Sequence, residues 1–267
     1  MATRTRTRTD PNALPEVTIS EDGEVRFLHL GTEWIQGSMI IDSPFEIELE
    51  YVQRMMAWLL FVEPDSVSAR HSMQLGLGSG ALTKFHFKKL KMDTTTIEIN
   101  PQVVVACRTW FKLPPDSAKL RVLLGDAAEV VRHAPFHGTI DALQVDLYDH
   151  EAAAPVLDSP DFYADCRNAL ATDRLSVMAV NLFGKHKSCK VNVDNIARAF
   201  DGRVLALPPS DRGNVIVFGF AGTDSELLWS ELRSRAAALR AATGLEFSRW
   251  LTAFRQSNAH DEAGFRL

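Results

Sequence analysis

The stretch "HSMQLGLGSGALTKFHFKKL", residues 71–90, carries the strongest fold signal in the chain. An apolar, strand-like segment runs into three glycines at alternate positions (Gly76, Gly78 and Gly80), and a helix-like pattern follows. A strand, a glycine turn and a helix in this order bring the backbone against a nucleotide and offer it free N–H groups. Through Ala81 the stretch also satisfies the dinucleotide pattern G-x-G-x-x-A. It therefore predicts a nucleotide site at the carboxyl edge of a parallel sheet.

The chain beyond this stretch repeats the same alternation. Short apolar strands are expected at 72–77, 94–99, 121–125, 139–146, 175–182, 203–208 and 214–220, and helices at 80–90, 101–111, 127–133, 160–170 and 189–200. Apolar strands interleaved with helices are typical of a parallel sheet that is covered on both faces. Only "PSDRG" separates the last two strands, so we expect them to form an antiparallel hairpin at one edge. The predicted class is α/β and Rossmann-like.

Three parts are expected along the chain: a disordered tail, a small N-terminal β region with its linking helix, and a Rossmann-like nucleoside-binding catalytic domain, at 1–20, 21–64 and 65–267. The β region lies in 24–42, and the Ser43 cap followed by Pro44 predicts a helix over 43–64. A capping box of Thr223 and Glu226 predicts a surface helix near the C-terminus.

Composition excludes several classes of protein. The 267 residues are 46% hydrophobic and 24% charged, as in an ordinary globular protein, and the net charge of −5 argues against nucleic acid as a partner. The longest apolar run, at 55–62, is too short for a membrane span. Three scattered cysteines (Cys107, Cys166, Cys189) and a start without an apolar signal region favour a cytoplasmic protein without disulfides.

Polar residues follow the next two predicted strands, where ligands of such sheets bind. Glu98 lies about 20 residues past the glycines, where a carboxylate accepts both hydroxyl groups of a ribose. The alternative is an acid that caps the helix beginning at Pro101. Asp126 and the Ala127 N–H stand where an adenine amino group is read, and the alternative for Asp126 is again a helix cap.

The fourth strand ends in "QVDLYDHE", with Asp146 closing an apolar run and Asp149 three residues later. Two carboxylates at this edge suit a cationic amine from which a proton must be taken. Tyr148 adds an aromatic face that attracts a cation. Two alternatives are a solvated acidic turn and a metal site at 149–151, but charged residues seldom end a buried strand without a partner. No metal is expected, because the acids and histidine at 149–151 lack distant partners of matching ligand character.

The segments "LGLGSGALTKF", "TIEINP", "LLGDAAEVV" and "VDLYD" together resemble the spermidine synthase (polyamine aminopropyltransferase) family, within the class I S-adenosylmethionine-dependent methyltransferase fold. The resemblance implies a seven-stranded, mostly parallel sheet behind a small N-terminal β domain. It also implies a homodimer and a small-molecule amine as acceptor. The co-substrate would be decarboxylated S-adenosylmethionine or S-adenosylmethionine, with no tightly bound cofactor.

By the same resemblance, residues of the glycine turn, the strand ends and the N-terminal region hold the nucleoside co-substrate: Gln36, Gly76, Gly78, Ser79, Gly80, Glu98, Asp126 and Ala127. Asp146 and Asp149 match the family's D-x-x-D pair, which binds and deprotonates the attacking amine, and Tyr148 would contact the amine. Ser79 stands where the family carries an acid that anchors the aminopropyl ammonium group.

This difference leaves several functions open. The leading one is aminopropyl transfer from decarboxylated S-adenosylmethionine to an amine. A methyltransferase using S-adenosylmethionine is the alternative that Ser79 favours, because an acid there would repel the donor's carboxylate. A catalytically inactive nucleoside-binding paralogue is a third hypothesis. A nicotinamide dehydrogenase is disfavoured, because Asp126 and Asp146 would then have no role.

Overall fold

The computed structural model describes residues 14–147 and 155–267. Its centre is a seven-stranded sheet in the order β6-β5-β4-β7-β8-β10-β9. The strands are β4 (His71–Leu75), β5 (Asp93–Glu98), β6 (Leu120–Leu124), β7 (Ala142–Val145), β8 (Ser176–Phe183), β9 (Val204–Ala206) and β10 (Asn214–Ala221). Pairing is parallel from β6 to β8, whereas β10 runs antiparallel to both β8 and β9. The predicted sheet with an antiparallel edge hairpin is confirmed.

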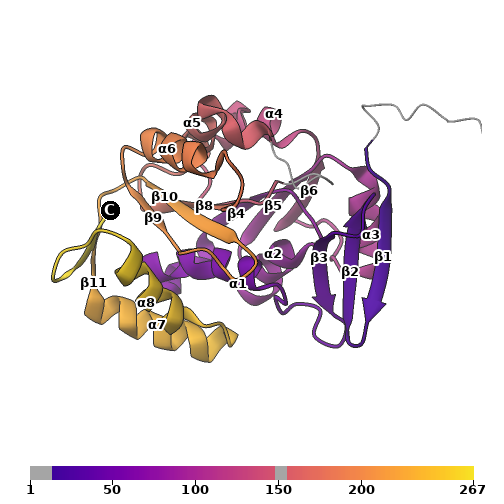
Figure 1. Cartoon of the computed structure of the whole chain (residues 1–267), viewed down its shortest axis with the longest axis horizontal. Coiled ribbons are helices and arrows are strands. Elements are labelled where there is room, and N and C mark those ends of the chain that lie inside the picture. Colours follow the sequence, from indigo (N-terminus) through magenta and orange to yellow (C-terminus); the bar gives the residue numbers. More distant parts are fainter. Residues whose placement is uncertain (1–13, 148–154) are drawn as a thin grey trace, which may run out of the picture.

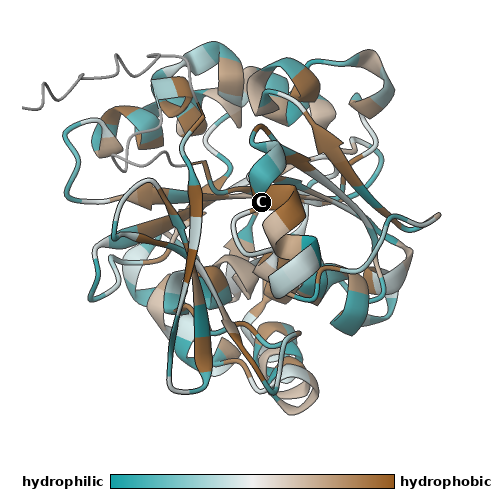
Figure 2. Ribbon diagram, turned by 90° about the vertical axis from the view of Figure 1, so that its right-hand side faces the viewer, coloured by the Kyte–Doolittle hydropathy of each residue, from teal (hydrophilic) through white to brown (hydrophobic). Residues whose placement is uncertain are grey.

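Helices cover both faces of this sheet (Figure 1). The crossover helices are α2 (Ala81–Lys84, extended by a π-helical turn over Phe85–Lys89), α3 (Pro101–Trp110), α4 (Ala127–Val131), α5 (Pro160–Ala169) and α6 (Cys189–Ala199). Alternate residues of β8 serve two separate cores, Val177 and Ala179 on one face and Met178 and Val180 on the other. In the two described ranges no helix has the length and hydropathy that a bilayer span requires. Figure 2 shows the apolar residues gathered on the central strands.

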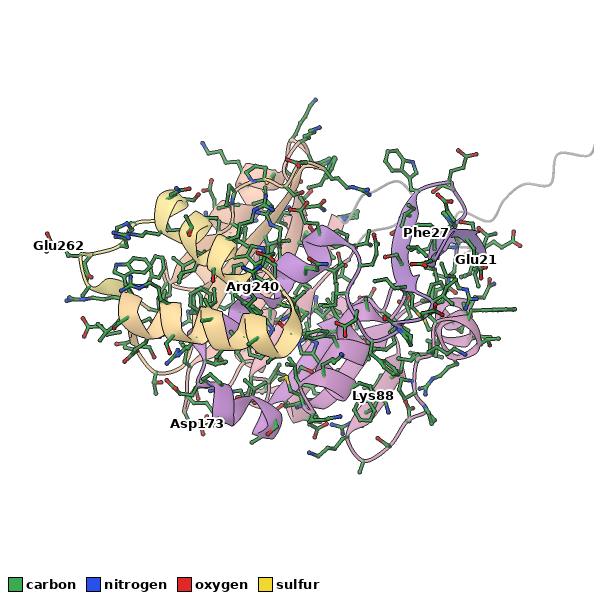
Figure 3. All side chains as sticks on the ribbon, turned by 90° about the horizontal axis from the view of Figure 1, so that it is seen from below. Glu21, Phe27, Lys88, Asp173, Arg240 and Glu262 are labelled. Carbon is green, nitrogen blue, oxygen red and sulfur yellow. The ribbon has the colours of Figure 1, made fainter. Side chains whose placement is uncertain are left out.

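The N-terminal region forms a separate three-stranded antiparallel sheet of β1 (Val17–Asp22), β2 (Val25–Leu30) and β3 (Ile35–Ile40). Glu21 and Phe27 mark this sheet at one end of the molecule, and Glu262 lies at the other (Figure 3). β1 begins inside the segment predicted to be a disordered tail, so that prediction is wrong from Val17 onward. The apolar side chains of Val17 and Ile19 pack against the cluster that joins this sheet to α3.

The helix predicted over 43–64 is shorter than expected. It consists of α1 (Glu50–Met55) and a 3-10 segment, Met56–Phe61, whose side chains are all buried. The chain before α1 is not helical, because Ile47 is buried in the core and the Gln53 side chain donates to the Ile47 carbonyl at 2.7 Å. Helix propensity is outweighed here by burial of a non-helical segment that contains a turn, closed by Glu46 N–H donating to the Ser43 carbonyl.

The predicted capping box at Thr223 and Glu226 is also wrong. Glu226–Leu228 is strand β11, which pairs with β12 (Gly264–Arg266) near the C-terminus, and helix α7 begins only at Trp229 and ends at Thr243. Leu227 is buried in the core cluster together with Phe265 of β12. The partner strand lies far along the chain, so local patterns could not reveal it. A further amphipathic helix, α8 (Phe247–Ser257), packs with α7 on one face of the central sheet.

Candidate active site

A cavity of about 410 Å³ lies at the carboxyl ends of β4, β5, β6 and β7. The predicted site residues that it brings together come from five separate segments of the chain. The predicted site residues that line it are Gln36, Gly76, Gly78, Glu98, Asp126, Ala127 and Asp146. The shared edge of the parallel strands produces this convergence, since each strand delivers the residue that follows it to the same side of the sheet.

Gly76 passes close to the end of β7. Its φ is +87°, and a Cβ at this position would lie 2.3 Å from the backbone oxygen of Asp146. The backbone N–H of Gly76 donates to the Ile97 carbonyl at 2.9 Å, which fixes the turn between β5 and β7. Only glycine fits both the conformation and the space. The first glycine therefore sets the distance between the turn and Asp146.

Ser79 and Gly80 do not line the large cavity. The Ser79 hydroxyl donates to the backbone oxygen of Ser38 at 2.8 Å, and Gly37 packs so closely that a Cβ there would lie 2.7 Å from Ser79 Oγ. Ser79 instead borders a small chamber of about 20 Å³ behind Asp146. Gly80, with a φ of +72°, is the residue that precedes α2 and allows the chain to enter this helix.

Glu98 is buried and accepts two backbone hydrogen bonds, from Leu77 N–H at 3.0 Å and from Asn100 N–H at 2.8 Å. Each bond uses a different carboxylate oxygen, so each oxygen keeps a second acceptor site for a ligand hydroxyl. Burial raises the pKa of Glu98, and the backbone N–H groups oppose that rise. The alternative role as helix cap is wrong, because Asn100 caps α3 by accepting from Gln102 N–H.

Asp126 caps a helix and also lines the cavity. Its Oδ1 accepts from Ala128 N–H at 2.8 Å and Glu129 N–H at 3.4 Å, so it caps α4. Oδ2 accepts no hydrogen bond from the described part of the chain, and the residue lines the cavity next to Ala127. A cap that leaves one oxygen facing the cavity suits an exocyclic amino group of a purine.

Asp146 is held by two neutral donors. Asn181 Nδ2 on β8 donates to its Oδ1 at 2.9 Å, and the Tyr51 hydroxyl on α1 donates to its Oδ2 at 3.2 Å. Burial raises the pKa of Asp146, and the hydrogen bonds from Asn181 and Tyr51 act in the opposite direction. A carboxylate whose pKa is raised is a stronger base than an ordinary aspartate, which suits a group that takes a proton from a ligand. The solvated acidic turn is therefore not the environment of Asp146.

Tyr51 and Asn181, which hydrogen-bond Asp146, are candidate site residues that the sequence did not single out. Tyr51 lies in α1, and its place in the cavity depends on how this helix packs against the sheet. Asn181 is a polar residue within the apolar strand 175–182, which is the signal that could have identified it. Tyr148, Asp149 and the metal alternative at 149–151 lie outside the described residues.

The charge of the cavity is one-sided. Three of its lining residues are carboxylic acids (Glu98, Asp126 and Asp146), and none of the described lining residues is a lysine, arginine or histidine. Across residues 14–147 and 155–267, no group of three His, Cys, Asp or Glu side chains has a geometry that could hold a metal ion. The described lining thus favours a cationic ligand and contains no counter-ion for an anionic group.

Together, the sheet order, the glycine turn and the acids at the strand ends define a protein of the Rossmann-like methyltransferase fold with an acidic cavity. No protein-family model matches the sequence. The chain is 36% identical over 264 residues to the polyamine aminopropyltransferase of Neisseria meningitidis serogroup A, covering 98% of this chain and 97% of that protein. It is 35% identical over 256 residues to the polyamine aminopropyltransferase of Chromobacterium violaceum, covering 96% and 95%. The chain belongs to the polyamine aminopropyltransferase family and is a transferase.

Solved structures agree on the fold. A probable spermidine synthase from Corynebacterium glutamicum superposes with a TM-score of 0.69 at 15% identity, covering 96% of this chain and 98% of that one. Human methyltransferase-like protein 13, in complex with SAH, gives a TM-score of 0.64 at 19% identity, covering 80% and 96%. A spermidine synthase in complex with the transition-state analogue AdoDATO gives 0.53 at 18% identity, covering 86% and 88%.

Proposed function

We propose that this transferase moves an aminopropyl group from decarboxylated S-adenosylmethionine to a small amine, with the nucleoside held by Glu98 and Asp126 and the amine held by Asp146. One observation carries the choice of donor: the described lining of the cavity has three carboxylic acids and no cationic side chain. The decarboxylated donor has a sulfonium and an ammonium group and no carboxylate, so its charge complements the cavity.

S-adenosylmethionine itself is the less favourable donor. In the proposed binding mode the methionine end of this donor faces Asp146. Its carboxylate would then have no arginine or lysine in the described lining to neutralise it. That position 79 is a serine and not an acid does not make S-adenosylmethionine the better donor. The Ser79 side chain is buried against the N-terminal sheet and donates to the Ser38 carbonyl, so it is not placed to select the donor.

The chemistry needs alignment and one proton transfer. The sulfonium carbon is already electrophilic, so the enzyme mainly brings the amine nitrogen in line with it. An alkylamine has a pKa of about 10, so it must lose a proton before it attacks. Asp146 binds the ammonium group and takes that proton. The products are methylthioadenosine and the aminopropylated amine.

The function is tested by incubating the purified protein with decarboxylated S-adenosylmethionine and a series of linear diamines. We expect stoichiometric methylthioadenosine and aminopropylated amine, and a rate at least about 100-fold lower for Asp146→Asn, since one general base contributes about that much. Nucleoside binding should stay within a few fold in this variant. Product only with S-adenosylmethionine, in methylated form, would overturn the proposal, and no product from either donor would favour an inactive paralogue.

The remaining expectations belong to the same proposal. Asp149 and Tyr148, which follow Asp146 in the chain, complete the amine side by resemblance to the family's D-x-x-D segment. We also infer a homodimer in the cytoplasm, with no nucleic acid or membrane as partner. Light scattering of the purified protein measures its oligomeric state directly and so tests the homodimer. A monomer at the concentration at which the enzyme is active would refute it.

A further inference from the structure

The acid of the proposed amine site is connected to the antiparallel strand β10 by a chain of two amides. Asn181 Nδ2 donates to Asp146 Oδ1 at 2.9 Å, and Asn214 Nδ2 donates to Asn181 Oδ1 at 3.0 Å. Asn181 lies within β8, and Asn214 is the first residue of β10. In strand register Asn214 pairs with Phe183, two residues beyond Asn181. The two amides are therefore diagonal neighbours across an antiparallel pair.

The Asn214 amide determines which way the Asn181 carboxamide is oriented. A carboxamide presents either its NH₂ group or its oxygen to a neighbour, and only the NH₂ group can donate to a carboxylate. In Asn181 the oxygen is engaged by Asn214, so the nitrogen faces Asp146. If Asn181 turned over, its oxygen would face the carboxylate and the two acceptors would repel each other. An unpaired acceptor next to a partly buried carboxylate is costly.

No charged side chain of the described chain contributes to the environment of Asp146. The neighbouring elements supply neutral groups: the Tyr51 hydroxyl from α1, Asn181 from β8 and, through it, Asn214 from β10. The glycine turn after β4 supplies the backbone of Gly76, and β3 supplies Gln36 at the cavity wall. Among the described residues, burial raises the pKa of Asp146 and the hydrogen bonds from Asn181 and Tyr51 act against this rise, while Glu98 and Asp126 are the other acids that line the cavity. The orientation of these dipoles therefore controls how much of the acid is ionised.

We propose that Asn214 is a positioning residue for Asp146: by donating to Asn181 Oδ1, it fixes the amide orientation in which Asn181 donates to the carboxylate. This inference rests on the proposed function only for its kinetic consequence, because the orientation of Asn181 is a property of the free protein. Asn214 contacts neither the cavity nor the reacting atoms. It acts through Asn181, so its loss should change the pKa of Asp146 and leave nucleoside affinity nearly unchanged.

The test measures the pKa of Asp146 in the free protein from the carboxyl carbon signal of ¹³C-labelled aspartate, assigned with Asp146→Asn. For Asn214→Leu we expect the pKa of Asp146 to rise by about 0.5 to 1 unit, as the donor from Asn181 is lost part of the time. The conservative variant Asn214→Gln keeps an amide and should restore part of the difference. The matched control is Asn195→Leu. Asn195 is likewise an asparagine whose side chain donates a hydrogen bond, and it is more buried than the half-buried Asn214, but it donates to the Asp158 carbonyl and has no hydrogen bond to Asn181 or Asp146 among the described residues.

The kinetic consequence is a shift of the acidic limb of the kcat/KM profile in the same direction and by a similar amount. Binding of methylthioadenosine by calorimetry should stay within a factor of about two. An unchanged pKa of Asp146 in a folded Asn214→Leu protein would overturn the inference, as would an equal shift in Asn195→Leu. If the pKa moves as expected and the wild-type protein transfers no aminopropyl group, the positioning role of Asn214 stands and the proposed function fails. If the wild type transfers the group normally and the pKa does not move in the variant, the proposed function stands and the positioning role fails.

Discussion

The contact between Gly76 and the end of β7 yields the sharpest test of how the site is built. We consider Gly76→Ala, with Gly138→Ala as its matched control. Both glycines have a positive φ, +87° at Gly76 and +68° at Gly138. They differ in the space around them: a Cβ at Gly76 would lie 2.3 Å from the Asp146 backbone oxygen, whereas nothing lies within 4 Å of one at Gly138. The pair therefore separates steric overlap from backbone strain.

The size of the effect follows from that overlap. Alanine in a left-handed conformation costs about 1 kcal/mol at either position. At Gly76 the contact must open from 2.3 Å to at least 3.0 Å, a shift of about 0.7 Å in the turn or in the backbone of Asp146. Overpacking of this kind adds about 2 kcal/mol. A misplacement close to 1 Å at a reacting group lowers the rate by about 100-fold. We therefore expect a loss of about 3 kcal/mol and about 10- to 100-fold in kcat for Gly76→Ala, against about 1 kcal/mol and no change in kcat for Gly138→Ala.

The assay combines urea unfolding with the rate of methylthioadenosine release at saturating substrates. Both variants are compared with the wild type at one temperature and pH, well below the unfolding midpoint of Gly76→Ala. Equal losses of stability at the two glycines would show that strain alone matters. Full turnover by Gly76→Ala would show that the backbone position of Asp146 is not set by the turn, and either result would refute the reasoning.

Three further substitutions probe buried groups. Glu98→Gln cannot accept from both Leu77 and Asn100, so we expect a loss of about 2 kcal/mol in unfolding free energy and about 30-fold weaker binding of methylthioadenosine; unchanged calorimetric affinity would reject the ribose assignment. Burial lowers the pKa of His86 from 6.5 to about 4, so its contribution to stability is present above pH 6.5 and is lost as pH falls toward 4. Acidification from pH 7 to 5 should therefore cost the wild type about 2 kcal/mol more than His86→Gln in urea unfolding, and identical pH dependences would contradict this. Burial likewise lowers the pKa of Lys84 from 10.5 to about 8, so its contribution is present above pH 10.5 and is lost as pH falls toward 8. Wild-type stability relative to Lys84→Met should rise by about 2 kcal/mol from pH 7 to 9.5, and a constant difference in urea unfolding would rule out a buried charge at Lys84.

Part of the site could be read from the sequence because its residues follow predicted strands. Glu98, Asp126 and Asp146 each stand at the end of a strand, and parallel strands of one sheet end on the same side, so their convergence follows from periodicity alone. Asp126 and Glu98 also illustrate the limit of local patterns. Both could have been helix caps, and only the structure shows that Asp126 caps α4 while Asn100, not Glu98, caps α3.

The amino-acid sequence by itself determined the order of strands and helices, the glycine turn and the acids at the sheet edge, because these depend on contacts between near neighbours in the chain. Only the tertiary structure decided the partners that lie far apart in sequence: β11 with β12, Ser79 with Ser38, and Tyr51 and Asn181 with Asp146. Such pairs form when separate elements pack, and the free energy that forms them comes from burying apolar faces elsewhere. No local pattern records that packing, so the residues that hold Asp146 become visible only in the folded chain.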